Sequence, residues 1–180
     1  MRREKTRRQR YDNKLKTAKT YPISLCAINF RVDDNLGYLI RSAACFGAER
    51  IYVVGHVPDR SHIKSSSGSL IDYVEIVQFA TPRDFLDHAE DQDIQIVSAE
   101  LVAGARSLSS YPFTFDRHMC LVVGTEQSGV PAEIIANSDV IYIEMPGPGF
   151  CLNTSQAANI LLYEAVSQYG NQVSIASRPN

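Results

Sequence analysis

The sequence is short of several features that mark specialised classes of protein. None of its 180 residues falls in an apolar run of eighteen or more, so no helix is expected to span a membrane. The four cysteines are isolated, with no Cys-x-x-Cys pair and no Cys/His cluster, which argues against a zinc site or other metal site and against a disulfide framework. Neither a Gly-x-Gly-x-x-Gly fingerprint nor a Walker lysine occurs, so a nucleotide-phosphate loop is weakly supported.

The N-terminus is basic, but no apolar segment follows it, so a secretory signal is not expected. An organellar transit peptide is the alternative, although residues 1–19 contain no serine and show no clear amphipathic pattern. Together with the isolated thiols, these observations predict a cytoplasmic protein.

The net charge of −2 hides a marked asymmetry along the chain. Residues 1–19 hold nine Lys or Arg and two Asp or Glu, a balance of +7, whereas the remaining residues hold nine basic and eighteen acidic side chains, a balance of −9. We therefore expect a basic arm at residues 1–20, flexible or helical, followed by a single domain at 21–180. A charge split of this kind predicts contact with a polyanion, either nucleic acid or an anionic membrane.

Beyond the arm, short apolar runs alternate with helical patterns. Strands are expected at 23–28, 51–54, 73–79, 94–99, 119–123 and 140–144, and helices at 35–46, 82–90 and 154–169. Loops are expected at 65–69 and 107–112. This alternation predicts an α/β fold with a largely parallel sheet, whose ligands gather at the C-terminal ends of the strands.

The first of three distinctive segments is D-D-N-L-G-Y-L-I-R-S-A-A-C-F-G at 33–47. Asp33, Asp34 or Asn35 can cap a helix that Gly47 ends. On a helical wheel Arg41 lies opposite the apolar face, one turn after a glycine, so its side chain is either an ordinary solvated arginine or a phosphate clamp or catalytic group.

The second and third segments each follow a buried strand. C-L-V-V-G-T-E-Q-S-G-V-P at 120–131 is a glycine-bounded turn with one carboxylate, which reads either as a plain tight turn or as a close approach of backbone to a ligand. I-Y-I-E-M-P-G-P-G-F-C-L-N-T-S-Q-A-A at 141–158 leads through two prolines and two glycines into a helix start. Ordinary N-capping explains Asn153 or Ser155, but a shaped backbone pocket explains the loop. The closing helix has a wide apolar stripe, so a subunit contact is plausible.

Taken together, the three segments resemble the three motifs of the SPOUT superfamily, specifically the SpoU/TrmH-like RNA 2′-O-ribose methyltransferases. The matching stretches are N-L-G-Y-L-I-R-S-A-A-C-F-G at 35–47, L-V-V-G-T-E-Q-S-G-V at 121–130 and I-E-M-P-G-P-G-F-C-L-N-T-S-Q-A-A at 143–158, and the likeness covers 21–170. The resemblance implies a parallel sheet with helices on both faces and a deep C-terminal trefoil knot, a rare exception to unknotted topology. It also implies a homodimer that takes S-adenosylmethionine as cofactor, releases S-adenosylhomocysteine and acts on tRNA or rRNA, with tRNA favoured.

The resemblance also implies a set of site residues. The catalytic candidates are Asn35, Arg41, Glu126 and Asn153. The cofactor candidates are Leu101, Gly124, Ile143, Leu152 and Asn153. The RNA-binding candidates are Arg41, from the first motif, and Arg2, Arg3, Arg7, Arg8 and Arg10 of the arm, from its positive charge. One position departs from the family, which usually has serine where this chain has Cys151, and a thiol is a poorer hydrogen-bond partner than a hydroxyl.

These residues suit methyl transfer to a ribose. A 2′-hydroxyl is a poor nucleophile, so the protein must orient it and help its proton leave. Arg41 is expected to bind the adjacent phosphate and stabilise the developing alkoxide; whether it is also the general base stays open, because guanidinium groups remain protonated. Asn35 and Asn153 are expected to orient groups, and Glu126 to fix the third-motif loop or Arg41. The alternatives are a non-catalytic RNA-binding module on the same fold and an α/β metabolite enzyme unrelated to RNA.

Overall fold

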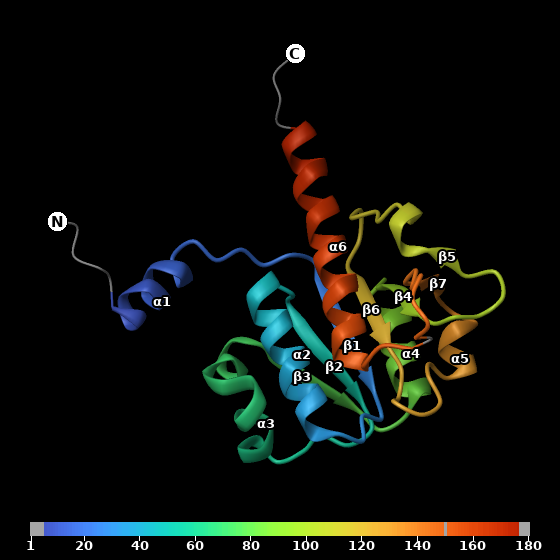
Figure 1. Cartoon of the computed structure of the whole chain (residues 1–180), viewed down its shortest axis with the longest axis horizontal. Coiled ribbons are helices and arrows are strands. Elements are labelled where there is room, and N and C mark those ends of the chain that lie inside the picture. Colours follow the sequence, from blue (N-terminus) through green and yellow to red (C-terminus); the bar gives the residue numbers. More distant parts are fainter. Residues whose placement is uncertain (1–5, 150, 177–180) are drawn as a thin grey trace.

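The protein is described here from a computed structural model that covers residues 6–149 and 151–176. Seven strands form one parallel sheet in the order β3-β2-β1-β6-β4-β7-β5 (Figure 1). The strands are β1 (Ile23–Ile28), β2 (Arg50–Val54), β3 (Glu75–Phe79), β4 (Gln95–Ala99), β5 (Arg106–Ser107), β6 (Met119–Val123) and β7 (Asp139–Tyr142). The helices are α1 (Arg7–Leu15), α2 (Asp33–Phe46), α3 (Arg60–Ser67), α4 (Pro82–Asp91), α5 (Ala132–Ile135) and α6 (Thr154–Ala176), with 3-10 turns η1 (Gly68–Tyr73) and η2 (Leu108–Ser110).

The central strands β1 and β6 are buried along their whole length, which explains why they read as continuous apolar runs rather than as alternating patterns. Leu25 of β1 pairs with Ile51 of β2 on one side and with Leu121 of β6 on the other. The sheet is therefore covered on both faces. Helices α2, α3 and α6 pack into the larger apolar cluster, and α4 and α5 pack into the smaller one.

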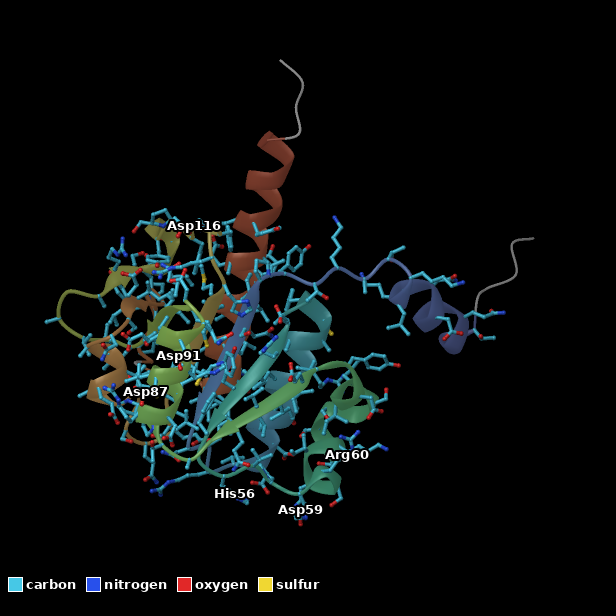
Figure 2. All side chains as sticks on the ribbon, turned by 180° about the vertical axis from the view of Figure 1, so that it is seen from behind. His56, Asp59, Arg60, Asp87, Asp91 and Asp116 are labelled. Carbon is cyan, nitrogen blue, oxygen red and sulfur yellow. The ribbon has the colours of Figure 1, made fainter. Side chains whose placement is uncertain are left out.

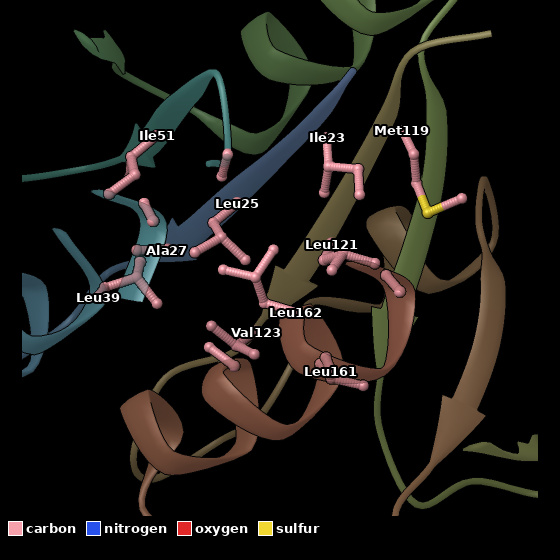
Figure 3. Packing of buried hydrophobic residues seen from close by; sticks show 14 of the residues in the cluster. Ile23, Leu25, Ala27, Leu39, Ile51, Met119, Leu121, Val123, Leu161 and Leu162 are labelled. Atoms are coloured by element: carbon pink, nitrogen blue, oxygen red, sulfur yellow. The ribbon is translucent and has the colours of Figure 1, made fainter. Parts of the chain in front are cut away.

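Helix α6 closes the larger cluster over β6. Leu161 and Leu162 of α6 are fully buried, and they lie over Leu121 and Val123 of β6 (Figure 3). Truncating a buried leucine of this kind to alanine costs about 2–5 kcal/mol, so α6 is a main contributor to the stability of this face. Within the described residues, no helix combines the length and apolarity that crossing a membrane requires.

Most elements expected from the sequence are confirmed. The expected strands at 23–28 and 119–123 coincide with β1 and β6. The other expected elements are present with different ends. For example, β7 ends at Tyr142, and α6 continues to Ala176. The arm contains α1, which begins with a capping box from Thr6 and Gln9 and stands apart from the sheet (Figure 1). Gly47 ends α2 in a left-handed conformation, as predicted.

The loop prediction at 65–69 was wrong. These residues form the end of α3 and the start of η1, and Tyr73 belongs to η1 rather than to the following strand. Serines have modest helix propensity, but burial of Ile63 and close packing of Ser66 against α2 override it. The expected loop at 107–112 likewise includes the end of β5 and all of η2.

The expected side-chain cap of α2 was also wrong. Val32 occupies the N-cap position, and no side chain caps the helix. Asn35 does not serve as a cap because its side chain is engaged by residues of the other two motifs.

Candidate functional site

The three motifs meet at the C-terminal edge of the sheet. Because β4, β6 and β7 are parallel, the residues that follow them emerge at the same edge. The residues that follow β4, β6 and β7 surround a cavity of about 530 Å³, which we call the strand-end cavity. The five residues expected to hold a cofactor all line it: Leu101, Gly124, Ile143, Leu152 and Asn153.

A tight turn from the second motif forms one wall of the strand-end cavity. Thr125 and Gly129 exchange backbone hydrogen bonds of 3.0 and 3.2 Å, and the Thr125 hydroxyl accepts a hydrogen bond from the Ser128 backbone at 2.9 Å. Gly124 lies so close to the far side of this turn that a side chain there would overlap the Gly129 backbone. Close packing of the turn therefore requires glycine at position 124, and the cavity wall here consists of backbone atoms.

Glu100, which follows β4, holds this turn in place. Its carboxylate accepts hydrogen bonds from the backbone N–H of Val130 at 2.8 Å and of Leu101 at 3.0 Å. A side chain on Gly129 would collide with the same carboxylate, and Gly129 has a positive φ of 67° that favours glycine. Glu100 therefore links the loop after β4 to the turn after β6. Glu100 was not among the residues predicted from the sequence, although a carboxylate directly after a buried strand is a usable signal.

Three of the four catalytic candidates form one hydrogen-bonded chain. The Asn35 amide donates to the Glu126 carboxylate at 2.7 Å, and the Asn153 amide donates to the Asn35 carbonyl oxygen at 2.9 Å. The Asn153 carbonyl oxygen in turn accepts from the Ser155 backbone N–H at 2.9 Å and from the Ser155 hydroxyl at 2.6 Å. This chain connects all three motifs, and Asn153 caps the start of α6 while taking part in it.

Glu126 also fixes the loop before α2, because its carboxylate accepts from the backbone N–H of Arg31 at 3.1 Å and of Val32 at 3.3 Å. Burial alone would raise the pKa of the Glu126 carboxyl, but hydrogen bonds from the Arg31 backbone, its own backbone, the Asn35 amide and the Val32 backbone lower that pKa below its ordinary value. Glu126 is therefore a carboxylate at neutral pH. It was expected to fix the third-motif loop or Arg41; it reaches the third motif through Asn35, and its hydrogen bonds include none with Arg41.

A second hollow of about 630 Å³ lies between α2 and the start of α6, and we call it the α2–α6 groove. Asn35 and Asn153 line it, and Asn153 also lines the strand-end cavity, so the hydrogen-bonded chain separates the two spaces. Arg41 lies on the groove wall, and its guanidinium donates to the carbonyl oxygen of Ser66 at 3.2 Å. The Ser66 side chain fills the space beside Gly37, which has no side chain of its own. Because the Arg41 guanidinium donates to the Ser66 carbonyl, α3 orients the Arg41 side chain.

Arg41 differs from most arginines of the body. The Arg41 side chain is exposed, and it forms no ion pair with a carboxylate of the residues that the structure describes. Five other arginines of the body do have carboxylate partners: Arg50, Arg60, Arg83, Arg106 and Arg117. The Arg41 guanidinium therefore keeps donors available for an anion that enters the groove.

The remaining predicted residues are placed as follows. Cys151 is exposed and lines the strand-end cavity. Arg2 and Arg3 lie outside the described residues, and Arg7, Arg8 and Arg10 lie in the first turn of α1. Over 6–149 and 151–176, no group of three His, Cys, Asp or Glu side chains is arranged to hold a metal ion.

Comparison with known proteins adds sequence relatives. Residues 22–163 match the SpoU rRNA Methylase family. The tRNA (guanosine(18)-2′-O)-methyltransferase of Escherichia coli K12 is 27% identical over 150 residues, which are 83% of this chain and 65% of that protein. The 23S rRNA (uridine(2479)-2′-O)-methyltransferase of Streptomyces viridochromogenes is 31% identical over 140 residues, 74% of this chain and 48% of that protein. The chain thus spans less than two thirds of the length of either relative.

Solved structures agree with these relatives. The SpoU methyltransferase AviRb from Streptomyces viridochromogenes, in complex with the cofactor AdoMet, superposes with a TM-score of 0.71 at 27% identity, covering 84% of this chain and 59% of that one. The TrmH/SpoU tRNA-modifying enzyme of A. aeolicus shares the fold, with a TM-score of 0.76 at 24% identity over 94% of this chain and 88% of that one. With its three motifs joined at one edge of a parallel sheet, and with 22–163 matching the family, the chain belongs to the SpoU rRNA methylase family.

Proposed function

We propose that this protein transfers the methyl group of S-adenosylmethionine to a ribose 2′-hydroxyl of RNA. The observation that carries the proposal is the hydrogen-bonded chain of Glu126, Asn35 and Asn153, which stands between the strand-end cavity and the α2–α6 groove. A cofactor in the first space and a ribose in the second would meet across Asn153. Retention of this chain together with Arg41 favours catalysis over a non-catalytic RNA-binding module.

The strand-end cavity suits the cofactor. Its volume lies within the usual range for small-molecule sites, and its lining combines apolar side chains with backbone at the ends of three strands. Thr154 lines this cavity, and its hydroxyl is buried and has no hydrogen-bond partner among the described residues. An orphaned buried hydroxyl is costly unless a ligand supplies a partner. When bound, S-adenosylmethionine supplies an already activated sulfonium methyl group, and S-adenosylhomocysteine would leave from the same cavity.

Arg41 would act on the RNA side. A ribose hydroxyl needs orientation and stabilisation of negative charge as its proton leaves. From the groove wall, Arg41 would bind the phosphate next to the target ribose and stabilise the developing alkoxide. Asn153 and Asn35 would orient the reacting groups, and Glu126 would keep Asn35 fixed through their 2.7 Å hydrogen bond.

RNA binding would also use the basic arm, which carries a net charge of +7, whereas the rest of the chain carries −9. Figure 2 shows the molecule from behind, on the side opposite to the view of Figure 1. The exposed carboxylates Asp87 and Asp91 of α4 and Asp116 are spread over this side. RNA would therefore approach the side of α2, with the arm adding sequence-independent attraction. Both tRNA and rRNA methyltransferases are among the relatives, and we favour tRNA as the substrate.

We also propose that the protein is a cytoplasmic homodimer whose C-terminal segment threads a trefoil knot. Support for the knot comes from the strand order: β6 lies between β1 and β4 although it follows β4 in the chain, and β7 returns to the far side of β4. Support for the dimer comes from the exposed apolar side chains Ile160 and Tyr163 of α6. Light scattering of the purified chain tests the dimer directly.

The activity is tested by incubating the protein with methyl-labelled S-adenosylmethionine and total RNA from cells. Label in RNA is expected. RNA binding without label would favour the binding module, and neither binding nor label would favour an enzyme unrelated to RNA. Deleting residues 1–19 should raise the RNA KM and flatten its dependence on salt while leaving cofactor affinity unchanged, because the lost contacts are with phosphates. Unchanged RNA affinity after the deletion would show that recognition lies wholly in the body.

A further inference from the structure

One exposed aromatic side chain in the α2–α6 groove has no role in the account so far. Tyr38 lies on α2, three residues after Asn35 and three before Arg41, so the three side chains occupy adjoining positions on one side of the helix. All three line the groove. The Tyr38 side chain is half exposed, at 50%, although most large apolar and aromatic side chains of α2 are buried.

The Tyr38 ring differs from the other aromatic rings around the groove. Phe46 and Tyr163 pack edge to face, with ring centroids 6.1 Å apart. For Tyr38, the described part of the chain offers no ring contact, and its hydroxyl makes no hydrogen bond there; its backbone carbonyl accepts a hydrogen bond from the Ser42 hydroxyl at 3.1 Å. The face of the Tyr38 ring is therefore available to a planar group that enters the groove.

The groove has the chemistry of a nucleotide site rather than of a purely apolar contact. Its volume of about 630 Å³ is ample for one nucleotide, and its wall combines the Arg41 cation with amides from both helices. Gln156 and Asn159 of α6 add donors and acceptors that could meet the edge of a base. Unstacked bases in RNA are commonly held by stacking on aromatic side chains such as tyrosine, and arginine commonly binds phosphate.

We propose that Tyr38 is the platform on which a base of the RNA substrate stacks, next to the ribose that is methylated. This inference rests on the proposed function and deepens it by assigning a substrate-binding residue. With Arg41 holding the phosphate and Tyr38 the base, one nucleotide is fixed at both ends. The ribose between them is then presented to Asn35 and Asn153.

The chain contains no tryptophan, which gives a direct optical test. Tyr38→Trp places a single tryptophan in the groove while keeping a stacking ring. Titration of this variant with unmodified tRNA should quench its fluorescence saturably, with a midpoint close to the RNA Kd of the unsubstituted protein. Tyr73→Trp is the matched control, because Tyr73 is equally exposed, at 49%, and lies outside the groove. No quenching is expected there.

Kinetics supply the second arm. Tyr38→Ala should raise the RNA KM by about 5- to 150-fold, the range expected for losing one base–aromatic stack, whereas Tyr38→Phe should stay within about twofold. The cofactor Kd should be unchanged in both. An unchanged RNA KM in Tyr38→Ala, or an equal loss in Tyr38→Phe, would overturn the proposal.

Two further outcomes also separate the alternatives. If Tyr38→Ala lowers the molecular mass in light scattering in parallel with activity, a second copy of the chain covers the ring and the proposal is wrong. If the unsubstituted protein transfers no label to RNA, the proposed function itself fails. In that case, absence of RNA-dependent quenching in Tyr38→Trp would overturn the stacking site as well, whereas quenching would retain it as an RNA-binding contact.

Discussion

The buried amide of Asn35 gives the sharpest test of the hydrogen-bonded chain. Asn35 is only 3% exposed, donates to Glu126 and accepts from Asn153. The substitution Asn35→Asp keeps the size and the acceptor but removes the donor. It places a carboxyl group where the donor of a 2.7 Å hydrogen bond to the Glu126 carboxylate was.

The size of the effect follows from that distance. Two unit negative charges separated by the 2.7 Å of the original contact repel each other by about 6 kcal/mol at an effective dielectric constant of 20, an upper limit because Glu126 is partly exposed. A repulsion of this order raises the apparent pKa of the pair well above the ordinary carboxyl value, so the two carboxyls share one proton at the acidic end of the pH range and lose it as the pH rises. With that proton the new side chain donates to Glu126 and accepts from Asn153, as the native amide does.

The assay is the ratio of kcat/KM for methyl transfer in Asn35→Asp to that in the unsubstituted protein, measured from pH 5.5 to 8.5. The ratio should be highest at low pH and fall by about tenfold per pH unit above the apparent pKa of the pair. Asn35→Ala serves as the control, and its deficit should not vary with pH. A ratio for Asn35→Asp that stays constant across the range would refute the proposed role of the chain.

Three further predictions concern other parts of the molecule. Arg41→Ala should lower kcat/KM about 10²- to 10³-fold and leave the cofactor Kd within a few-fold, because the lost guanidinium acts on the RNA side. Glu100→Ala should weaken cofactor binding measured by calorimetry by about tenfold, since it frees the turn that forms the cavity wall. Burial lowers the pKa of His118, whose ring is hydrogen-bonded to Ser24 at 2.7 Å, so folding stability should be full above about pH 6.5 and fall as the pH drops below it.

Each of these predictions has an outcome that would contradict it. Normal turnover in Arg41→Ala would remove that residue from catalysis, and an unchanged cofactor Kd in Glu100→Ala would show that the turn holds its shape without the carboxylate. For His118, urea midpoints at pH 5.5 and 7.5 should differ in the unsubstituted protein and converge in His118→Asn. The same pH difference in both proteins would assign the effect to another group.

The sequence was most informative where burial dictates the residue type. Continuous apolar runs predicted β1 and β6 because strands buried on both faces of a parallel sheet need no alternation. The serine-rich end of α3 was misread because its helical state depends on packing against α2, where Ser66 fits beside Gly37. Local propensity carries no information about such a contact.

The site shows the same division. The motifs and their order predicted which residues belong together, and Gly124, Ile143 and Leu152 do line one cavity. The hydrogen bond that joins Glu126 to Asn35 spans 91 positions in the chain, and its partners follow only from the folded sheet. The same holds for the contact of Glu100 with Val130, which depends on β4 and β6 lying side by side.

The most direct test of the central claim is the position of the transferred methyl group within the nucleotide. RNA labelled by the protein from methyl-labelled S-adenosylmethionine is digested with alkali, which cleaves every linkage that has a free 2′-hydroxyl. Transfer to a ribose predicts label in an alkali-resistant dinucleotide. Label in single nucleotides would place the methyl group on a base and contradict the account.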